Sequence, residues 1–411
     1  MSRPGQREFF TVKTVSEAFT GFRPSRRTRA ETTAIDEAFG RVPAEALHAP
    51  HALPGFARAT VDGFAVRAAD TYGASEGLPS YLDLAGEVRM GLPPEVEVRS
   101  GTAVAIATGA PLPSGADAVL KVEHTQSATP ELLEVLKPVT PGEGLVRADE
   151  DAAPGHALAK PGRPLRAQDL GMLAAVGITE LPVYARPRVA IVSTGDELVP
   201  ADAQSLSLGQ VRDATAPALT ALIREAGGEP EFIGIVPDDR DALTTTLRGL
   251  LDHFDVLVVS AGSSVGSRDE TAAAIASLGE PGIWCHGLAF RPGKPTLLAD
   301  CGGVPVIGLP GNPRSALVVF RLIGIPIVRM VGGCTEPPRE PRVTAVLARD
   351  LPSAAGRLDV VQVRLSGGRA EPLFGSSSLL SILTAADGYV VVPEAATGLA
   401  AGSEVEVTLY R

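Results

Sequence analysis

The segment from residue 187 to residue 331 alternates short apolar runs with helix-like stretches, and this alternation is the strongest constraint on the fold. The apolar runs are RVAIVST, EFIGIVP, DVLVVSAG and VPVIGL, separated by stretches such as APALTALIREAGG and DDRDALTTTLRGLL. Strands that alternate with helices form parallel sheets joined by right-handed crossovers. The pattern therefore predicts a doubly wound, mostly parallel sheet, with Gly227 at the end of its first helix.

Four loops follow the predicted strands, and all of them are rich in polar residues or glycine. Their sequences are STGDEL, VPDD, SAGSSVGSRDE and GLPGNP. Because doubly wound sheets bind ligands beyond the carboxyl ends of their strands, we expect the four loops to gather on one rim of the sheet. That rim is the predicted position of a binding site.

The loop GLPGNPRSA, residues 308–316, carries the signals of a tight turn that opens a helix. Asn312 is the predicted N-cap, Pro313 suits the first helical position and Arg314 adds a cation. Exposed backbone N–H groups at such a helix start can meet an anion. The candidate substrate-binding residues of this loop are Gly311, Asn312 and Ser315.

The loop SAGSSVGSRDE, residues 260–270, combines serine hydroxyls with glycines that permit close backbone approach. Ser267 and Glu270 match a capping box that would open a helix, and this places Asp269 in the first turn. Asp269 then either complements the helix dipole or belongs to a binding site. A plain connection needs neither four serines nor two glycines, so a site is favoured. Its candidate substrate-binding residues are Ser260, Gly262 and Ser263.

Carboxylates occur on three of the rim loops. Asp196 and Glu197 lie in STGDEL, Asp238 lies in VPDD, and Asp269 lies in the serine-rich loop. Capping alone explains any single one; Asp238, with Asp241 three residues later, has the spacing of an N-cap and its partner. Several carboxylates on one rim repel one another without a cation, and Mg²⁺ takes one or two carboxylates together with substrate phosphates. The candidate Mg²⁺ ligands are Glu197, Asp238 and Asp269.

The segment FRPGKP, residues 290–295, holds Arg291 and Lys294 three residues apart in a loop stiffened by two prolines. Solvated surface charge is the plainer interpretation. A rigid loop with a fixed Arg/Lys pair is better suited to an oxyanion. We therefore treat Arg291 and Lys294 as candidate substrate-binding residues.

Two further loops, between about 51 and 145, carry polar residues. TVDGFA places Asp62 before a glycine, and ATGAPLPSGADAV has Thr108 at the base of a proline-rich loop. Taken singly, each of these loops predicts a turn rather than a site.

Composition limits the classes of partner and location. The 411 residues carry a net charge of −11, which argues against nucleic acid or an anionic membrane as a partner. The longest apolar stretch is interrupted by Arg321, Pro326 and Arg329, and predicts a buried helix that ends near Pro326 rather than a membrane span. Three cysteines without CxxC pairing and six histidines without metal spacing argue against zinc. The N-terminus has no apolar leader, so a reducing, cytoplasmic location is expected.

Composition and hydrophobic periodicity divide the chain into four parts. Residues 1–50 and 146–186 are predicted to form a helical linker domain, on stretches such as TTAIDEAFGRV and RAQDLGMLAAVGI. Residues 51–145 predict a small β-rich insertion, and 187–331 the α/β domain. Residues 335–411 predict a C-terminal β-barrel, with a sandwich as the alternative topology. The expected fold class is therefore α/β multidomain.

Seven of these motifs, taken together, resemble the molybdopterin molybdenumtransferases, the molybdenum-inserting enzymes of molybdenum-cofactor biosynthesis that are related to the gephyrin E domain. They are TVDGFAVRAADT, ATGAPLPSGADAV, STGDEL, GQVRDAT, SAGSSVGSRDE, RPGKP and GLPGNPRSA, in the order of the family. As a set they are highly specific, although any one alone is weak. The resemblance covers nearly the whole chain.

The resemblance implies a four-domain, elongated homodimer whose active site lies in a cleft between subunits. The implied reaction takes adenylylated molybdopterin and molybdate, needs Mg²⁺, and yields molybdenum cofactor, AMP and water. It also implies the molybdopterin adenylyltransferase and recipient molybdoenzymes as candidate protein partners. Carried over by position, the candidate catalytic residues are Asp62, Thr108, Asp238 and Asp269.

The chain departs from the family pattern at several positions. Ala261 replaces the second residue of the usual SGG, where a left-handed backbone would disfavour alanine. Thr215 stands where asparagine is usual. These departures leave room for a diverged paralogue, such as a non-catalytic molybdopterin-binding carrier or scaffold. A molybdopterin adenylyltransferase, which uses the same α/β module, is the other alternative.

Overall fold

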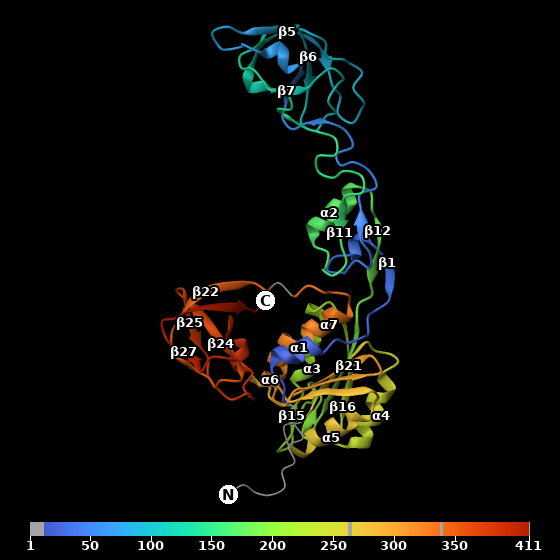
Figure 1. Cartoon of the computed structure of the whole chain (residues 1–411), viewed down its shortest axis with the longest axis vertical. Coiled ribbons are helices and arrows are strands. Elements are labelled where there is room, and N and C mark those ends of the chain that lie inside the picture. The colour runs from blue at the N-terminus through green and yellow to red at the C-terminus, as the bar shows by residue number, and fades with distance from the viewer. Residues whose placement is uncertain (1–11, 262–264, 338–339, 411) are drawn as a thin grey trace.

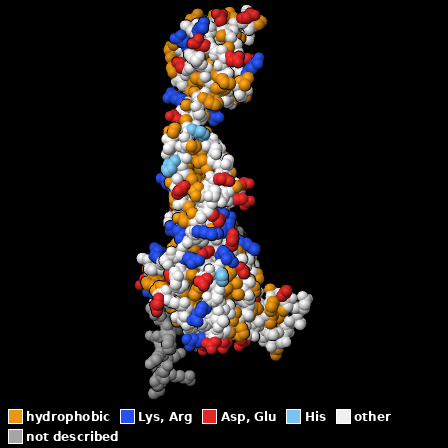
Figure 2. Space-filling view, turned by 90° about the vertical axis from the view of Figure 1, so that its right-hand side faces the viewer, with side chains coloured by type: hydrophobic (Ala, Val, Ile, Leu, Met, Phe, Trp, Pro, Cys, Tyr) orange, Lys and Arg blue, Asp and Glu red, His pale blue; other side chains and the backbone are white. Residues whose placement is uncertain are grey.

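The computed structural model describes residues 12–261, 265–337 and 340–410 of the chain. Figure 1 shows an elongated molecule, with a β-rich part at one end and an α/β part beside a C-terminal β part at the other. A slender connecting segment joins the two ends, and Figure 2 shows the same narrow connection from the side. The predicted mixed α/β, multidomain class is confirmed. The boundaries of the four predicted domains stay predictions.

The β-rich part at the far end is a six-stranded sheet. Apolar residues at alternate positions, such as Leu82, Leu120 and Leu133, form its core. The sheet has the order β7-β4-β6-β5-β9-β8. Its strands are β4 (Gly63–Val66), β5 (Ser80–Glu87), β6 (Thr102–Ile106), β7 (Ala118–Lys121), β8 (Thr125–Thr129) and β9 (Leu132–Val135).

The connecting segment is less helical than predicted. TTAIDEAFGRV does not form a helix: its first residues belong to β1 (Ala30–Ala34), which pairs with β12 (Glu180–Tyr184), and a single 3₁₀ turn follows. Two consecutive β-branched threonines facing the complementary run ELPVY explain the preference for a strand. The predicted helix is confirmed in RAQDLGMLAAVGI, as α2 (Ala167–Ala175). The remaining short strands are β2 (Leu47–His48), β3 (Arg58–Ala59), β10 (Leu145–Val146) and β11 (Ala157–Ala159).

The α/β part contains the predicted doubly wound sheet, in the order β16-β13-β17-β21-β20-β18. The first four strands are parallel and the last two antiparallel. They are β13 (Arg188–Thr194), β16 (Glu229–Val236), β17 (Val256–Ser260), β18 (Pro281–His286), β20 (Leu297–Cys301) and β21 (Val304–Leu309).

Helices cover both faces of this sheet. Leu219 of α3 (Thr215–Glu225) packs in one core, and Leu247 of α4 (Arg240–Leu250) in the other together with α5 (Val265–Ala276). The N-terminal helix α1 (Val15–Gly21) joins the first core through Ala18. Gly227, directly after the cap of α3, has φ +88°, which confirms its predicted role at the helix end. A short excursion between β13 and α3 contains β14 (Leu198–Val199) and β15 (Val211–Arg212).

The helix after GLPGNP does not end near Pro326, and that prediction is wrong. It runs as α6 (Pro313–Val319), a π-helical turn η4 (Phe320–Gly324) and α7 (Ile325–Val331). A wider π turn directly before the proline accommodates the missing N–H and the bulk of the ring. No helix of the described residues is long and apolar enough to cross a membrane.

The C-terminal part is a closed barrel, as predicted. Its sheet order is β19-β24-β25-β22-β28-β26, and an added β24–β26 pairing closes five of these strands. The strands are β22 (Arg342–Leu347), β24 (Leu358–Ser366), β25 (Arg369–Pro372), β26 (Gly388–Val392) and β28 (Glu404–Leu409), with a small ribbon of β23 (Leu351–Pro352) and β27 (Gly398–Leu399) and the short helix α8 (Ser381–Thr384). The sixth strand, β19 (Phe290–Arg291), comes from the RPGKP loop and pairs with β24.

Candidate active site

The carboxyl ends of β13 and β16 meet on the predicted rim. Thr194, the last residue of β13, donates its hydroxyl to Asp238 Oδ1 at 2.7 Å, and the N–H of Asp238 donates to Asp196 Oδ1 at 3.2 Å. Asp238 is not the N-cap of α4. That cap is Asp239, whose side chain accepts from the N–H of Ala242 at 2.8 Å. Because the neighbouring residue caps the helix, the carboxylate of Asp238 is available on the rim.

A second acidic residue is buried under the rim, and sequence reasoning did not single it out. Asp213, in GQVRDAT, accepts a 2.6 Å hydrogen bond from the hydroxyl of Ser193. Its other oxygen accepts from the N–H groups of Thr215 and Ala216, the first two residues of α3. Asp213 therefore ties the start of α3 to β13. Thr215, one of the departures from the family pattern, is buried at this helix start.

The serine-rich loop is only partly described. Ser260 ends β17 with 4% of its surface exposed, while Gly262 and Ser263 lie outside the described residues. Helix α5 begins at Val265, so the predicted capping box of Ser267 and Glu270 is wrong, and Asp269 is not in the first turn. The side chain of Asp269 lies outside the described residues, and its predicted role stays a prediction.

Ala261 does not have the backbone that would disfavour it. Among the described residues other than glycine, the one with positive φ is Asp149. Ala261 is buried, and its N–H donates to the carbonyl of Leu309 in the adjacent strand β21. The substitution for glycine therefore introduces no backbone strain at this position.

The loop GLPGNP opens a helix as predicted, with Pro313 as its first residue. Asn312 is the N-cap residue, as predicted, although its side chain makes no capping hydrogen bond. The carbonyl of Asn312 accepts from the N–H of Ala316 at 3.0 Å. Ser315 is 4% exposed in the first turn, and Gly311 and Asn312 are half-buried before it.

The RPGKP loop packs directly against this helix. Gly293 has φ +124°, and a Cβ atom added there would lie 2.2 Å from Val319 Cγ2 of α6. The hydroxyl of Thr296 donates to the carbonyl of Gly293 at 2.7 Å, which fixes the turn. The loop therefore has a defined position beside α6, the helix that begins at the rim and is called the rim helix below, with Lys294 exposed.

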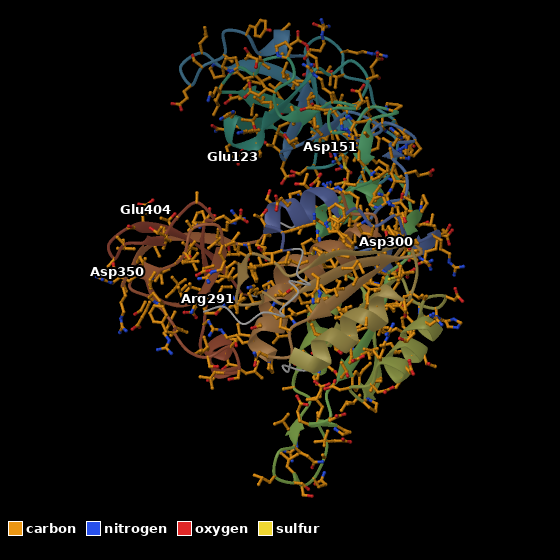
Figure 3. All side chains as sticks on the ribbon, turned by 60° about the horizontal axis from the view of Figure 1, so that its bottom comes forward. Glu123, Asp151, Arg291, Asp300, Asp350 and Glu404 are labelled. Carbon is orange, nitrogen blue, oxygen red and sulfur yellow. The ribbon has the colours of Figure 1, made fainter. Side chains whose placement is uncertain are left out.

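Arg291 lies between the α/β part and the C-terminal barrel, as Figure 3 shows. Its Nη1 is 3.9 Å from Asp359 Oδ2, and its side chain is 66% exposed. The same carboxylate forms a closer pair with Arg357, at 2.6 Å from Nε. Two guanidinium groups thus share one buried carboxylate at the junction. Sequence reasoning missed Arg357 and Asp359, because only the β19–β24 pairing brings them to Arg291.

Asp62 and Thr108 are in contact, but far from the rim. The N–H and the hydroxyl of Thr108 both donate to Asp62 Oδ1, at 2.7 and 2.8 Å. These two bonds, the N–H first, lower the pKa of Asp62 below the usual aspartate value. Both residues belong to the β-rich part, at the opposite end of the molecule from the α/β part (Figure 1). One chain alone does not bring them to Asp238.

Comparison with known proteins identifies the family. Residues 12–177 match the family model described as the MoeA N-terminal region (domains I and II), 190–330 a probable molybdopterin-binding domain, and 344–410 the MoeA C-terminal region (domain IV). Molybdopterin molybdenumtransferase 2 of Mycobacterium tuberculosis is 33% identical, over 93% of this chain and 95% of that protein. The chain belongs to the molybdopterin molybdenumtransferase family. The family predicted from the seven motifs is confirmed.

Other relatives in the family agree over the full length. Molybdopterin molybdenumtransferase of Bacillus subtilis is 30% identical, over 94% of this chain and 91% of that protein. The crystal structure of the molybdopterin biosynthesis MoeA protein from Pyrococcus horikoshii OT3 has a TM-score of 0.84 at 30% identity, covering 97% of this chain and all of that chain. Matches of this extent confirm the predicted enzyme class and a role in molybdenum-cofactor biosynthesis.

Proposed function

We propose that this chain transfers molybdenum from molybdate to adenylylated molybdopterin, releasing AMP and forming the molybdenum cofactor at the rim of the α/β part. The observation that carries this proposal is the packing of Gly293 against Val319. Val319 is the last residue of the helix that begins at GLPGNP, so the cationic RPGKP loop packs on that helix. This contact supports a site bordered by both the cations and the rim loops. A diphosphate substrate and an oxyanion need both kinds of group close together.

In this proposal the molybdate oxyanion is held by the cations at the junction with the barrel. Arg291 and Arg357 share the single carboxylate of Asp359, and Lys294 is exposed on the same loop as Arg291. These three cations and one carboxylate carry net positive charge, which favours a dianion. The turn around Gly293 fixes the backbone from which Arg291 and Lys294 extend.

The carboxylates on the rim suit Mg²⁺ together with the substrate's diphosphate. Asp196 and Asp238 are linked at the ends of β13 and β16, and Glu197 follows on the same loop. Within the described part of the chain, no three His, Cys, Asp or Glu side chains form a complete metal site. One or two carboxylates plus substrate phosphates is the way in which Mg²⁺ is commonly bound. When bound there, Mg²⁺ would neutralise charge on the diphosphate. The hydroxyl of Thr194 holds one oxygen of Asp238 in position.

We propose that the active form is a homodimer, in which Asp62 and Thr108 of one subunit complete the rim of the other. The separation of the β-rich part from the α/β part within one chain supports this arrangement (Figure 1). Two cavities, of about 430 and 720 Å³, lie elsewhere, and neither is lined by Asp62, Asp238 or Lys294. A cytoplasmic location also belongs to the proposal, because all three cysteines are free and buried.

Reconstitution tests the proposed reaction against its two alternatives. Purified protein is incubated with adenylylated molybdopterin and low molybdate, with and without Mg²⁺, and AMP and cofactor are measured. Mg²⁺-dependent release of both supports the transferase. Adenylylation of molybdopterin by ATP without molybdenum transfer supports an adenylyltransferase instead. Tight binding of molybdopterin with no turnover supports a carrier. Mixing with the adenylyltransferase or a recipient molybdoenzyme tests the proposed protein partners.

A further inference from the structure

Arg314, the residue between Pro313 and Ser315 in GLPGNPRSA, is a buried cation without a carboxylate partner among the described residues. It is 7% exposed. Burial lowers the pKa of its guanidinium, Tyr410 partly opposes this shift, and the nearby positive charge of Arg291 adds to it. Removing an arginine from water is costly unless its donors are satisfied, so the hydrogen bonds of Arg314 indicate what the residue is for.

All the hydrogen bonds of this guanidinium go to the C-terminal barrel. Nε donates to Gln362 Oε1 at 2.9 Å, and Nη2 donates to the same oxygen. Nη1 donates to the carbonyl of Gly375 at 2.9 Å and approaches the carbonyl of Ser376 at 3.5 Å. Gln362 lies in the barrel strand β24, whereas residues 374–379 form an exposed segment between β25 and α8. The Arg314 side chain thus donates hydrogen bonds to a strand and to a loop at the same time.

The segment held by Arg314 has few other anchors. Its remaining described hydrogen bonds are local: the hydroxyls of Ser376 and Ser378 are 2.9 Å apart, and the N–H of Leu379 donates to the carbonyl of Ser376 at 3.1 Å. Bonds of this kind shape a turn but do not fix its position relative to the α/β part. Arg314 supplies that attachment, one residue before the rim serine Ser315.

We propose that Arg314 is a positioning residue, which holds the segment 374–379 of the barrel against the rim helix and so sets the barrel side of the molybdate site. The proposal rests on the proposed function for its catalytic consequence. Only a planar fork reaches one amide oxygen and a carbonyl in different segments at once. A lysine keeps the charge but has a single nitrogen with which to donate.

If Arg314 had a purely structural role, it would attach the whole barrel to the α/β part. Other contacts also make that attachment. Arg321 pairs with Glu225 of α3 at 3.1 Å and with Glu340 at 3.5 Å. Glu340 also accepts from the hydroxyl of Tyr389 in the barrel strand β26, at 3.1 Å. Loss of Arg314 is therefore expected to loosen the segment 374–379 while the barrel stays in place.

The test compares Arg314→Met and Arg314→Lys with Arg369→Met, which removes an exposed arginine of the barrel strand β25. Amide hydrogen exchange is followed by mass spectrometry in the full-length protein, and kcat and KM for molybdate are measured in the reconstituted reaction. We expect exchange in 374–380 to rise roughly tenfold in Arg314→Met and less in Arg314→Lys, with the rest of the barrel unchanged. KM for molybdate should rise roughly tenfold in Arg314→Met with a smaller change in kcat, and Arg369→Met should match the wild type in both.

Each other outcome overturns a stated part of the inference. Unchanged exchange in 374–380 in both folded Arg314 variants would show that the residue does not hold the segment. Faster exchange across the whole barrel would assign Arg314 to barrel attachment. Faster exchange in 374–380 with unchanged KM would show that the position of the segment has no bearing on molybdate. If Arg314→Met fails to fold, the exchange of Arg314→Lys decides. If the wild type transfers no molybdenum, the proposed function fails, while the exchange data still decide the structural part.

Discussion

The hydroxyl of Thr194, the last residue of β13, donates a 2.7 Å hydrogen bond to Asp238, in the loop that follows the neighbouring strand β16. The bond holds one oxygen of the Asp238 carboxylate at the rim. Asp239, one residue later, is occupied in capping α4. Two adjacent aspartates therefore have separate roles, and they form a matched pair for mutation.

Asp238→Asn should reduce molybdenum transfer by roughly a hundredfold or more, because the proposed Mg²⁺ ligand loses its charge. The Mg²⁺ concentration needed for half-maximal activity should rise in the same variant. Asp239→Ala is the control: it should cost about 1 kcal/mol of stability through the lost cap and keep full activity. Mg²⁺ titrations of activity and thermal unfolding of both variants check this. Equal activity losses in the two variants would contradict the assignment.

A mixture of Asp62→Asn and Asp238→Asn proteins should recover activity that neither variant has alone. If one subunit supplies Asp62 and its partner supplies Asp238, random exchange makes half the dimers mixed, each with one intact site. Activity should then reach roughly a quarter of the wild-type value. The measurement is transfer activity after the two variants have been mixed under conditions that permit subunit exchange. No recovery despite verified exchange would place the whole site within one chain.

Arg291→Ala should raise KM for molybdate by roughly tenfold without loss of stability, because its side chain is 66% exposed and its pairing with Asp359 is long. Arg357→Ala should also destabilise the protein, since it removes the close partner of a buried carboxylate. Steady-state kinetics and urea unfolding of the two variants distinguish these effects. An unchanged KM in both would remove the junction with the barrel from the site.

Acid should weaken the connecting segment through Asp169. This carboxylate is 7% exposed and accepts hydrogen bonds from Arg163 and Arg166, which hold its pKa well below the ordinary value. A depressed pKa means that the pair stabilises the fold at neutral pH, and that this stability is lost as the pH falls below the ordinary aspartate range.

Asp169→Asn should therefore cost roughly 3 kcal/mol at neutral pH and flatten the acid limb of the stability curve. Glu97→Ala, which breaks an exposed ion pair with Arg99, should change stability by less than about 1 kcal/mol. Denaturant unfolding at a series of pH values measures both. A parallel acid limb in Asp169→Asn and wild type would refute the assignment.

Local sequence signals predicted the α/β part well, because its elements depend on periodicity and on glycine and proline at their ends. The alternation of strands and helices along the chain, the start of α6 at Pro313 and the role of Gly227 all follow from residues close in sequence. The order of the strands in the sheet, including the antiparallel β18 and β20, depends on pairing between distant segments. The same kind of signal failed in TTAIDEAFGRV, where apolar spacing suggested a helix. There the pairing with β12, far along the chain, favoured a strand instead.

What the sequence by itself determined was the family, the doubly wound sheet and the set of rim loops, since each is written in contiguous motifs. Only the tertiary structure decided which of two neighbouring aspartates is available, and that Arg291 shares the carboxylate of Asp359 with Arg357. It also showed that Arg314 donates its hydrogen bonds to the barrel. The reason is physical: short motifs specify local backbone conformation, whereas the partners of a buried charge are chosen by packing between distant segments.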